Sequence, residues 1–222
     1  MAVALLIPMA FGMLITNEAD EGNSIFFSLS GMQFASAVIL VLAALAVTSE
    51  YRFGTIRTTL QAQPGRARVL WTKAGVIALV AFVIGELAAF ATFGASRFFD
   101  EAGVLVLRSA DDWRMVTGYG LVYALLAVIS VAVGSLVRHP AGAVTALLVW
   151  SLAIENLISL IPGFGDDMYR LMPFVNGTLF AGDPQITGVI DPLSTLGSLG
   201  VLAGTAFALL GIATVVLRRR DA

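Results

Sequence analysis

Residues 74–96 read AGVIALVAFVIGELAAFATFGAS, and this stretch decides the fold class. Its apolar residues follow one another without the alternation of a barrel strand, and Glu86 is its one charged residue. The hydrocarbon core of a bilayer is about 30 Å thick, and about 20 residues of α-helix cross it. Because a helix satisfies its backbone hydrogen bonds internally, the stretch predicts a membrane-spanning helix.

Five further runs of similar character occur along the chain. Hydrophobic residues make up 58% of the 222 residues and charged residues 13%, about half the charge of a typical soluble domain. We therefore predict an all-α, polytopic membrane bundle of about six spans that forms a single domain over residues 1–222. The first run is the shortest, and we expect a trimmed span there. The predicted spans lie near residues 1–16, 25–47, 74–96, 116–137, 141–161 and 194–217.

The basic residues indicate the orientation of these spans, because cytoplasmic connections carry an excess of Arg and Lys. One set of connections holds nine of the 13 basic residues, and most acidic residues fall in the other set. We therefore predict a multi-pass protein with both termini in the cytoplasm. One Lys against twelve Arg, with much Ala, Val and Gly, is typical of a GC-rich bacterial genome, so we expect a bacterial inner (plasma) membrane. The predicted cytoplasmic set is Arg52, Arg57, Arg66, Arg68, Lys73, Arg138, Arg218, Arg219 and Arg220, and the outer set is Arg97, Arg108, Arg114 and Arg170.

The connection at residues 48–73 reads TSEYRFGTIRTTLQAQPGRARVLWTK. Ser49 is a residue type that caps helix N-termini, and Glu50 suits the positive first turn that would follow. Apolar residues recur at three- and four-residue steps from Phe53 to Leu60, which gives one apolar stripe. The pattern predicts a short amphipathic helix at the inner membrane interface. A basic surface loop without a special role is the alternative.

The same connection contains Glu50-Tyr51-Arg52 and Gly54-Thr55-Ile56-Arg57, followed by Leu60, Pro64, Arg66 and Lys73. These residues resemble a loop of type-2 ABC transporter permeases, E-Y-x-x-G-T-I-R-x-x-L, then a Pro, an Arg and a Lys that opens the next span. The resemblance extends to the six-span layout and to the long outer segment before the last span. It implies a coupling helix that docks on a separate cytoplasmic ATP-binding subunit, and a second permease copy or paralogue in the bilayer. The residues expected to contact the ATPase are Glu50, Arg52, Thr55, Ile56 and Arg57.

The energy source is expected in the partner, because no G-x-x-x-x-G-K-[ST] loop occurs in this sequence. We thus expect no cofactor in this chain, and ATP with magnesium in the partner ATPase. Ser–His or His-x-x-Glu-His arrangements are also absent, so the sequence does not indicate an enzyme. No stretch concentrates basic residues as a nucleic-acid site would. Family members usually begin with a basic interfacial helix, whereas this sequence starts inside the first predicted span.

Polar residues inside two predicted spans are candidate pathway residues. Glu86 lies in the third span, and Glu155 and Asn156 lie in the fifth. A charged carboxylate at the centre of a bilayer costs about 3 kcal/mol, so such groups usually face a cavity or a partner. A structural, paired carboxylate is the alternative at each site. If they carry protons, the chain is an ion-driven secondary transporter that uses Glu86 or Glu155. A membrane scaffold without transport is a third possibility.

Three further features have local interpretations. Residues 162–192 are too polar to span, and residues 168–180 within them predict either a short re-entrant outer helix or a surface loop. His139 precedes Pro140 and is interpreted as a helix-end residue. The G-x-x-x-G pair Gly200 and Gly204 predicts close helix packing in the core, with a contact to a second copy as the alternative.

Overall fold

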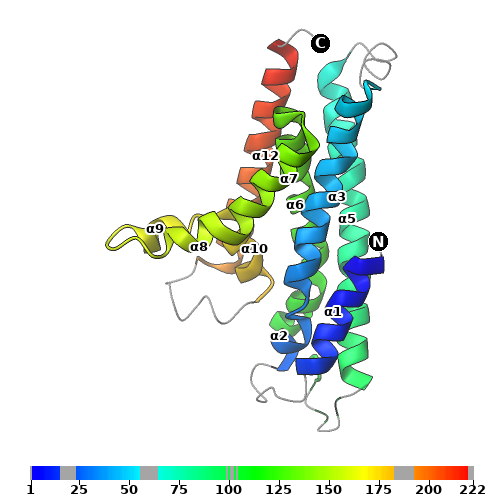
Figure 1. Ribbon diagram of the computed structural model, residues 1–222. Helices are drawn as coiled ribbons and strands as arrows, with labels where there is room; N and C mark the ends of the chain where they lie inside the picture. The colour runs from blue at the N-terminus through cyan, green and yellow to red at the C-terminus, as the bar shows by residue number, and fades with distance from the viewer. Residues whose placement is uncertain are drawn as a thin grey trace.

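The computed structural model describes residues 2–15, 24–55, 65–98, 100, 103, 105–182 and 193–219. These residues form helices joined by turns, with no strand among them, and the predicted all-α class is confirmed (Figure 1). The elements in chain order are α1 (Ala2–Ile15), α2 (Ser24–Leu29), α3 (Met32–Phe53), α5 (Arg66–Phe98), α6 (Ala110–Val137), α7 (Pro140–Val149), the π-helical turn η2 (Trp150–Ile154), α8 (Glu155–Ile158), α9 (Gly165–Tyr169), α10 (Pro173–Phe180) and α12 (Thr195–Arg219).

Five helical segments of the described chain are long and apolar enough to cross a membrane. They coincide with the second to sixth predicted spans. The segment at the first predicted span, α1, is helical and apolar but has 14 residues, about 21 Å of rise. The five long segments are Ile25–Phe53, Ala67–Phe98, Ala110–Val137, Pro140–Ile158 and Thr195–Arg219.

Helix α6 is the centre of the bundle. In its apolar stretch 72% of the residues are buried, against 17% in Pro140–Ile158. Helices α5, α3 and α12 pack around α6. The crossing with α5 is close, because a Cβ at Gly85 would lie 2.9 Å from the Cα of Gly120. Glycine is required there because any side chain would push the two backbones apart.

No new helix begins at Ser49. Helix α3 continues through Glu50 to Phe53 and ends at Gly54, whose φ of 72° is left-handed. The predicted N-terminal cap at Ser49 is therefore wrong. Polar residues do not interrupt the hydrogen bonding of a helix, whereas glycine adopts the left-handed conformation that ends one. The rest of the predicted coupling helix, residues 56–64, lies outside the described residues.

The fourth long segment, Pro140–Ile158, bends away from the bundle. It begins at His139, whose Nδ1 accepts a hydrogen bond from the Gly142 N–H (3.3 Å), so the predicted helix-end role is confirmed. The π-helical turn η2 follows α7, and such turns are a recognised cause of helix kinks. Beyond η2, α8 and α9 project sideways from the other helices (Figure 1). The bend opens space between this segment and α3.

Helix α10 brings the chain back to the bundle. It packs against α12 and α6, and Phe174, Val175 and Phe180 on it are buried. A short helix was one of two structures that the sequence allowed for residues 168–180. The surface-loop alternative is wrong for α10, because its apolar side chains complete the packing of two long helices.

The G-x-x-x-G pair does not pack inside the chain. No atom of the described residues lies within 4 Å of a Cβ placed at Gly200 or Gly204, although Gly118 and Gly134 do meet neighbouring side chains. The expected core packing of Gly200 and Gly204 is therefore wrong. They lie on an open face of α12, and their contact with a second copy stays a prediction.

The helix ends group as the charge pattern requires. The C-terminal ends of α3, α6 and α12 lie together with the N-terminal ends of α5 and α7 (Figure 1). We call this end of the bundle the inner end, and its assignment to the cytoplasm stays a prediction. Its described basic residues are Arg52, Arg68, Lys73, Arg138, Arg218 and Arg219.

Candidate functional site

A cavity of about 460 Å³ lies between α3, α6, the bent segment η2–α8 and the short helices α9 and α10. The first turns of α3 and the middle of α6 form one side of it. Glu155 and Asn156 of the bent segment line the opposite side, and α10 forms a third wall. The bend at η2 moves α8 outward. The cavity is a consequence of that bend.

Glu155 connects two walls of this cavity. Its side chain is 1% exposed, and its carboxylate accepts hydrogen bonds from the backbone N–H groups of Phe174 (3.2 Å) and Val175 (2.8 Å). These two groups belong to the first turn of α10, where N–H groups have no partner within the helix. The carboxylate therefore acts as the N-terminal cap of α10, supplied by a different helix.

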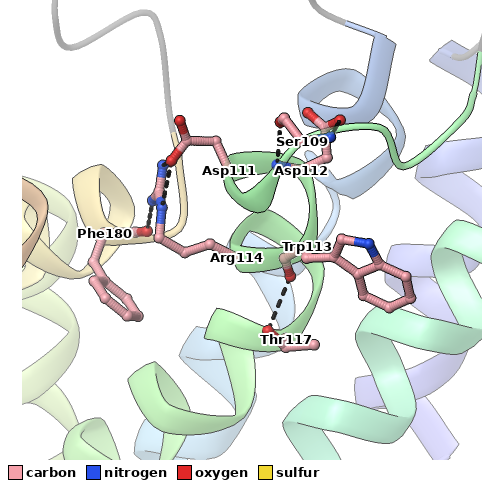
Figure 2. Close-up of polar contacts among 7 residues, drawn as sticks. All are labelled: Ser109, Asp111, Asp112, Trp113, Arg114, Thr117 and Phe180. Atoms are coloured by element: carbon pink, nitrogen blue, oxygen red, sulfur yellow. Dashed lines mark hydrogen bonds and ion pairs between the residues drawn. The ribbon is translucent and has the colours of Figure 1, made fainter.

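Arg114 holds the other end of α10 (Figure 2). One of its guanidinium nitrogens, Nη1, donates a hydrogen bond to the backbone carbonyl of Phe180, the last residue of α10. The guanidinium carbon also lies 6.0 Å from the centroid of the Phe180 ring, and Asp111 forms an ion pair with Arg114 at 3.2 Å. A capping box between Ser109 and Asp112 begins α6 at this position, which orients Arg114 toward α10.

Helix α10 is thus held by an acid at its N-terminus and a base at its C-terminus. A helix carries a partial positive charge at the first end and a partial negative charge at the second, so both side chains complement its dipole. Glu155 comes from α8 and Arg114 from α6, which ties the bent segment to the central helix through α10. We call these eight residues with their two end contacts the clamped helix.

A buried hydroxyl determines the opposite wall. The hydroxyl of Tyr123 on α6 donates to the backbone carbonyl of Met32, at the start of α3, over 2.6 Å. Tyr123 is fully buried, and both residues line the cavity. A buried hydroxyl without a partner would be costly, so this bond determines how the first turn of α3 sits against α6.

The two carboxylates predicted as a pathway are not brought together. Glu155 lines the cavity, whereas Glu86 on α5 is absent from the described lining and packs against the backbone of Gly120 on α6. A Cβ at Gly120 would clash with the Glu86 carboxylate. Asn156 is exposed at the edge of the cavity that it lines, and its Nδ2 donates to the Leu152 carbonyl (2.9 Å) of its own helix.

Three of the predicted ATPase-contact residues, Glu50, Arg52 and Thr55, lie at the inner end. Glu50 forms an ion pair with Lys73, so the end of α3 is joined to the start of α5. Arg52 and Thr55 are exposed there, with the Thr55 hydroxyl 3.5 Å from the Glu50 carbonyl. Ile56 and Arg57 lie outside the described residues, so the structure does not test their predicted role.

The neighbouring residue Tyr51 joins a third helix to the same place. The guanidinium carbon of Arg138 lies 5.4 Å from the centroid of the Tyr51 ring. Arg138 ends α6 with a φ of 59°, directly before the turn into α7. We call Glu50, Tyr51, Lys73 and Arg138 the inner junction, because together they connect α3, α5 and the α6–α7 turn.

Sequence reasoning missed Arg114, Tyr123 and the internal pairing of Glu50. The Ser109–Asp112 capping box was readable from the sequence, and it would have shown that Arg114 lies near the start of a helix. The partners of Tyr123 and Arg114 are 91 and 66 positions away along the chain. No periodicity connects residues so far apart.

No model of a known protein family matches the chain, and no curated protein is significantly similar to it. The geometry described above is therefore the basis for the function proposed below.

Proposed function

We propose that this chain is the membrane-spanning permease subunit of an ATP-driven ABC exporter. It forms the substrate pathway with a second copy or paralogue in a bacterial inner membrane, and a separate cytoplasmic ATPase supplies the energy. The family-like residues Glu50 to Arg57 and the cavity are the two parts that this function requires. The observation that supports the proposal is the way one helix joins them.

Helix α3 is that connection. Its C-terminal turn carries Glu50 and Arg52, and its N-terminal turn lines the cavity with Met32 and Gln33. Its 22 residues are helical without a break, which gives a rod of about 33 Å. Displacement of the inner end of this rod would therefore reach the cavity directly.

The inner junction would spread the same displacement to other helices. The Glu50–Lys73 ion pair joins α3 to α5, and the Tyr51–Arg138 contact joins α3 to the α6–α7 turn. A partner changes the populations of two states only if it interacts with them differently. An ATPase that moves on binding ATP would interact differently with the two states if it contacts the segment that follows Gly54.

The proposal is tested by co-purification and by coupling of ATP hydrolysis to transport. We expect Arg57→Glu to weaken binding of the ATPase by about tenfold or more, or to leave hydrolysis uncoupled from transport. Glu50→Ala should uncouple without loss of the fold. Arg108→Glu is the matched control, because it reverses an exposed charge at the opposite end of the bundle. Wild-type binding and transport in both inner-end variants would contradict the proposal.

A second measurement tests the predicted orientation. The chain has no cysteine, so single-cysteine variants report accessibility without background labelling. Arg57→Cys should react with a membrane-impermeant maleimide only after the inner side is exposed, and Arg108→Cys should react from outside. The reverse pattern would contradict the orientation. Transport by the purified chain alone on an ion gradient, lost in Glu86→Gln, would support the secondary transporter instead.

A further inference from the structure

We propose that the cavity beside the clamped helix binds an apolar molecule that is cationic or that carries a hydrogen-bond donor, and that it rejects anions. Calling that molecule a transported substrate rests on the function proposed above. Binding itself depends only on this chain. The size, the hydrogen-bonding character and the charge of the cavity each support the inference.

The size of the cavity suits a small molecule. Its volume of about 460 Å³ lies within the range of about 300–1,000 Å³ that is typical of ligand pockets. Two of the side chains that line the cavity, Phe34 on α3 and Leu152 on the bent segment, are 51% and 64% exposed. The cavity is therefore open between these two elements. Tyr119, Val122 and Phe174 supply apolar and aromatic walls.

Three hydroxyl groups in the walls present acceptors to the cavity. The hydroxyl of Ser36 donates to the Gln33 carbonyl (2.6 Å), and that of Thr178 donates to the Val175 carbonyl (2.8 Å). The Ser151 hydroxyl also donates to a carbonyl of its own helix, that of Leu148. Each hydroxyl has one proton, so only oxygen lone pairs remain for a ligand. A ligand with donors fits these three hydroxyl groups better than one that only accepts.

The charge of the cavity also disfavours anions. Glu155 is the one charged side chain among the described residues that line it. The positive N-terminus of α10 also points to this region, but its Phe174 and Val175 N–H groups already bind the Glu155 carboxylate. No described cation or free helix N-terminus therefore remains to stabilise an anion, and burial of an unpaired anion is costly.

A pair of probes with opposite charge and the same shape tests this inference. Tetraphenylphosphonium and tetraphenylborate are both spherical, apolar ions, and triphenylmethanol is an uncharged relative with one donor. The purified chain in phosphatidylcholine nanodiscs is titrated with each. Trp150 reports binding, because its ring lies 5.3 Å from that of Phe174 in the cavity wall. Trp71 and Trp113 are changed to Phe so that Trp150 is the only fluorescent tryptophan.

We expect saturable binding of tetraphenylphosphonium and triphenylmethanol, and only linear partitioning of tetraphenylborate into lipid. Ser36→Phe should fill the cavity and weaken saturable binding by about tenfold or more. Thr72→Phe, on the exposed face of α5, is the matched control and should bind as the parent does. Ser36→Arg should reverse the preference in favour of tetraphenylborate.

Several results would overturn the inference. These are equal saturable binding of both ions, no saturable binding of either, or binding that Ser36→Phe leaves unchanged. A phospholipid that is retained by the purified protein and blocks all three probes would also overturn it. Selective binding without any ATPase partner would leave the inference standing and contradict the exporter proposal. An ATPase complex without selective binding of the probes would support the exporter proposal and contradict the inference about the cavity.

Discussion

The inner junction and the clamped helix both use charged side chains to join helices, but they do so with different partners. At the inner junction, Glu50 and Lys73 bind each other, and their side chains are 26% and 21% exposed. At the clamped helix, Glu155 is buried and binds backbone N–H groups, and Arg114 binds a backbone carbonyl. The first contact is between two side chains that are partly accessible to water. The second completes the hydrogen bonding of a helix.

The two kinds of contact differ in free energy. A solvent-accessible ion pair contributes about 0–1 kcal/mol, because water solvates both charges when they separate. A buried backbone donor that loses its partner costs about 1–3 kcal/mol, because no water replaces it. The inner junction can therefore rearrange at small cost, and the clamped helix cannot. This is the distribution expected if the inner end transmits motion and α10 keeps the cavity wall in shape.

Glu155→Ala is the change with the largest expected effect. It leaves the N–H groups of Phe174 and Val175 buried without an acceptor, and we expect a loss of about 3 kcal/mol in the free energy of unfolding. Amide hydrogen exchange should increase first in α10. Thermal unfolding in detergent and exchange by mass spectrometry measure the two effects.

Asn156→Ala is the control for this change. Asn156 is the adjacent residue, but it is exposed and bonds only within its own helix, so we expect a loss below about 0.5 kcal/mol. Similar destabilisation by the two substitutions would show that α10 does not depend on the Glu155 cap. The clamped helix would then not differ from the inner junction in the way described above.

Arg114→Met has an intermediate expected effect. It keeps the aliphatic stem against Phe180 but removes the donor to the Phe180 carbonyl, at an expected cost of about 1–2 kcal/mol. Hydrogen exchange should increase at the C-terminal turn of α10 and much less at its N-terminal turn. Arg108→Met, at an exposed position near the same helix start, should leave exchange in α10 unchanged. Equal hydrogen exchange in the two variants would show that Arg114 does not stabilise the C-terminal end of α10.

The smallest effect on stability is expected at the inner junction. In a double-mutant cycle of Glu50→Gln and Lys73→Met, the coupling free energy should be below about 1 kcal/mol and should fall with added salt. Unfolding in detergent at two salt concentrations measures it. A coupling above about 2 kcal/mol would place the ion pair among the buried contacts and erase the difference between the two regions.

The sequence predicted the helices better than their ends. The segment Ala110–Val137 contains the predicted span 116–137, and its additional residues are the polar first turns that hydropathy does not count. The prediction at Ser49 failed because a residue that can cap a helix also continues one when the backbone around it is helical. Gly54 was the better signal for the end of α3, because the left-handed conformation excludes most other residues.

The sequence by itself determined that the chain is a helical membrane bundle and which helix ends lie together. Length, hydropathy and charge are local properties, and each run of apolar residues has them without reference to the rest of the chain. Only the tertiary structure decided that Glu155 caps α10 while Glu86 packs on Gly120. Two carboxylates in apolar runs look alike in a sequence. Their roles differ because a helix N-terminus is folded against one and a glycine backbone against the other.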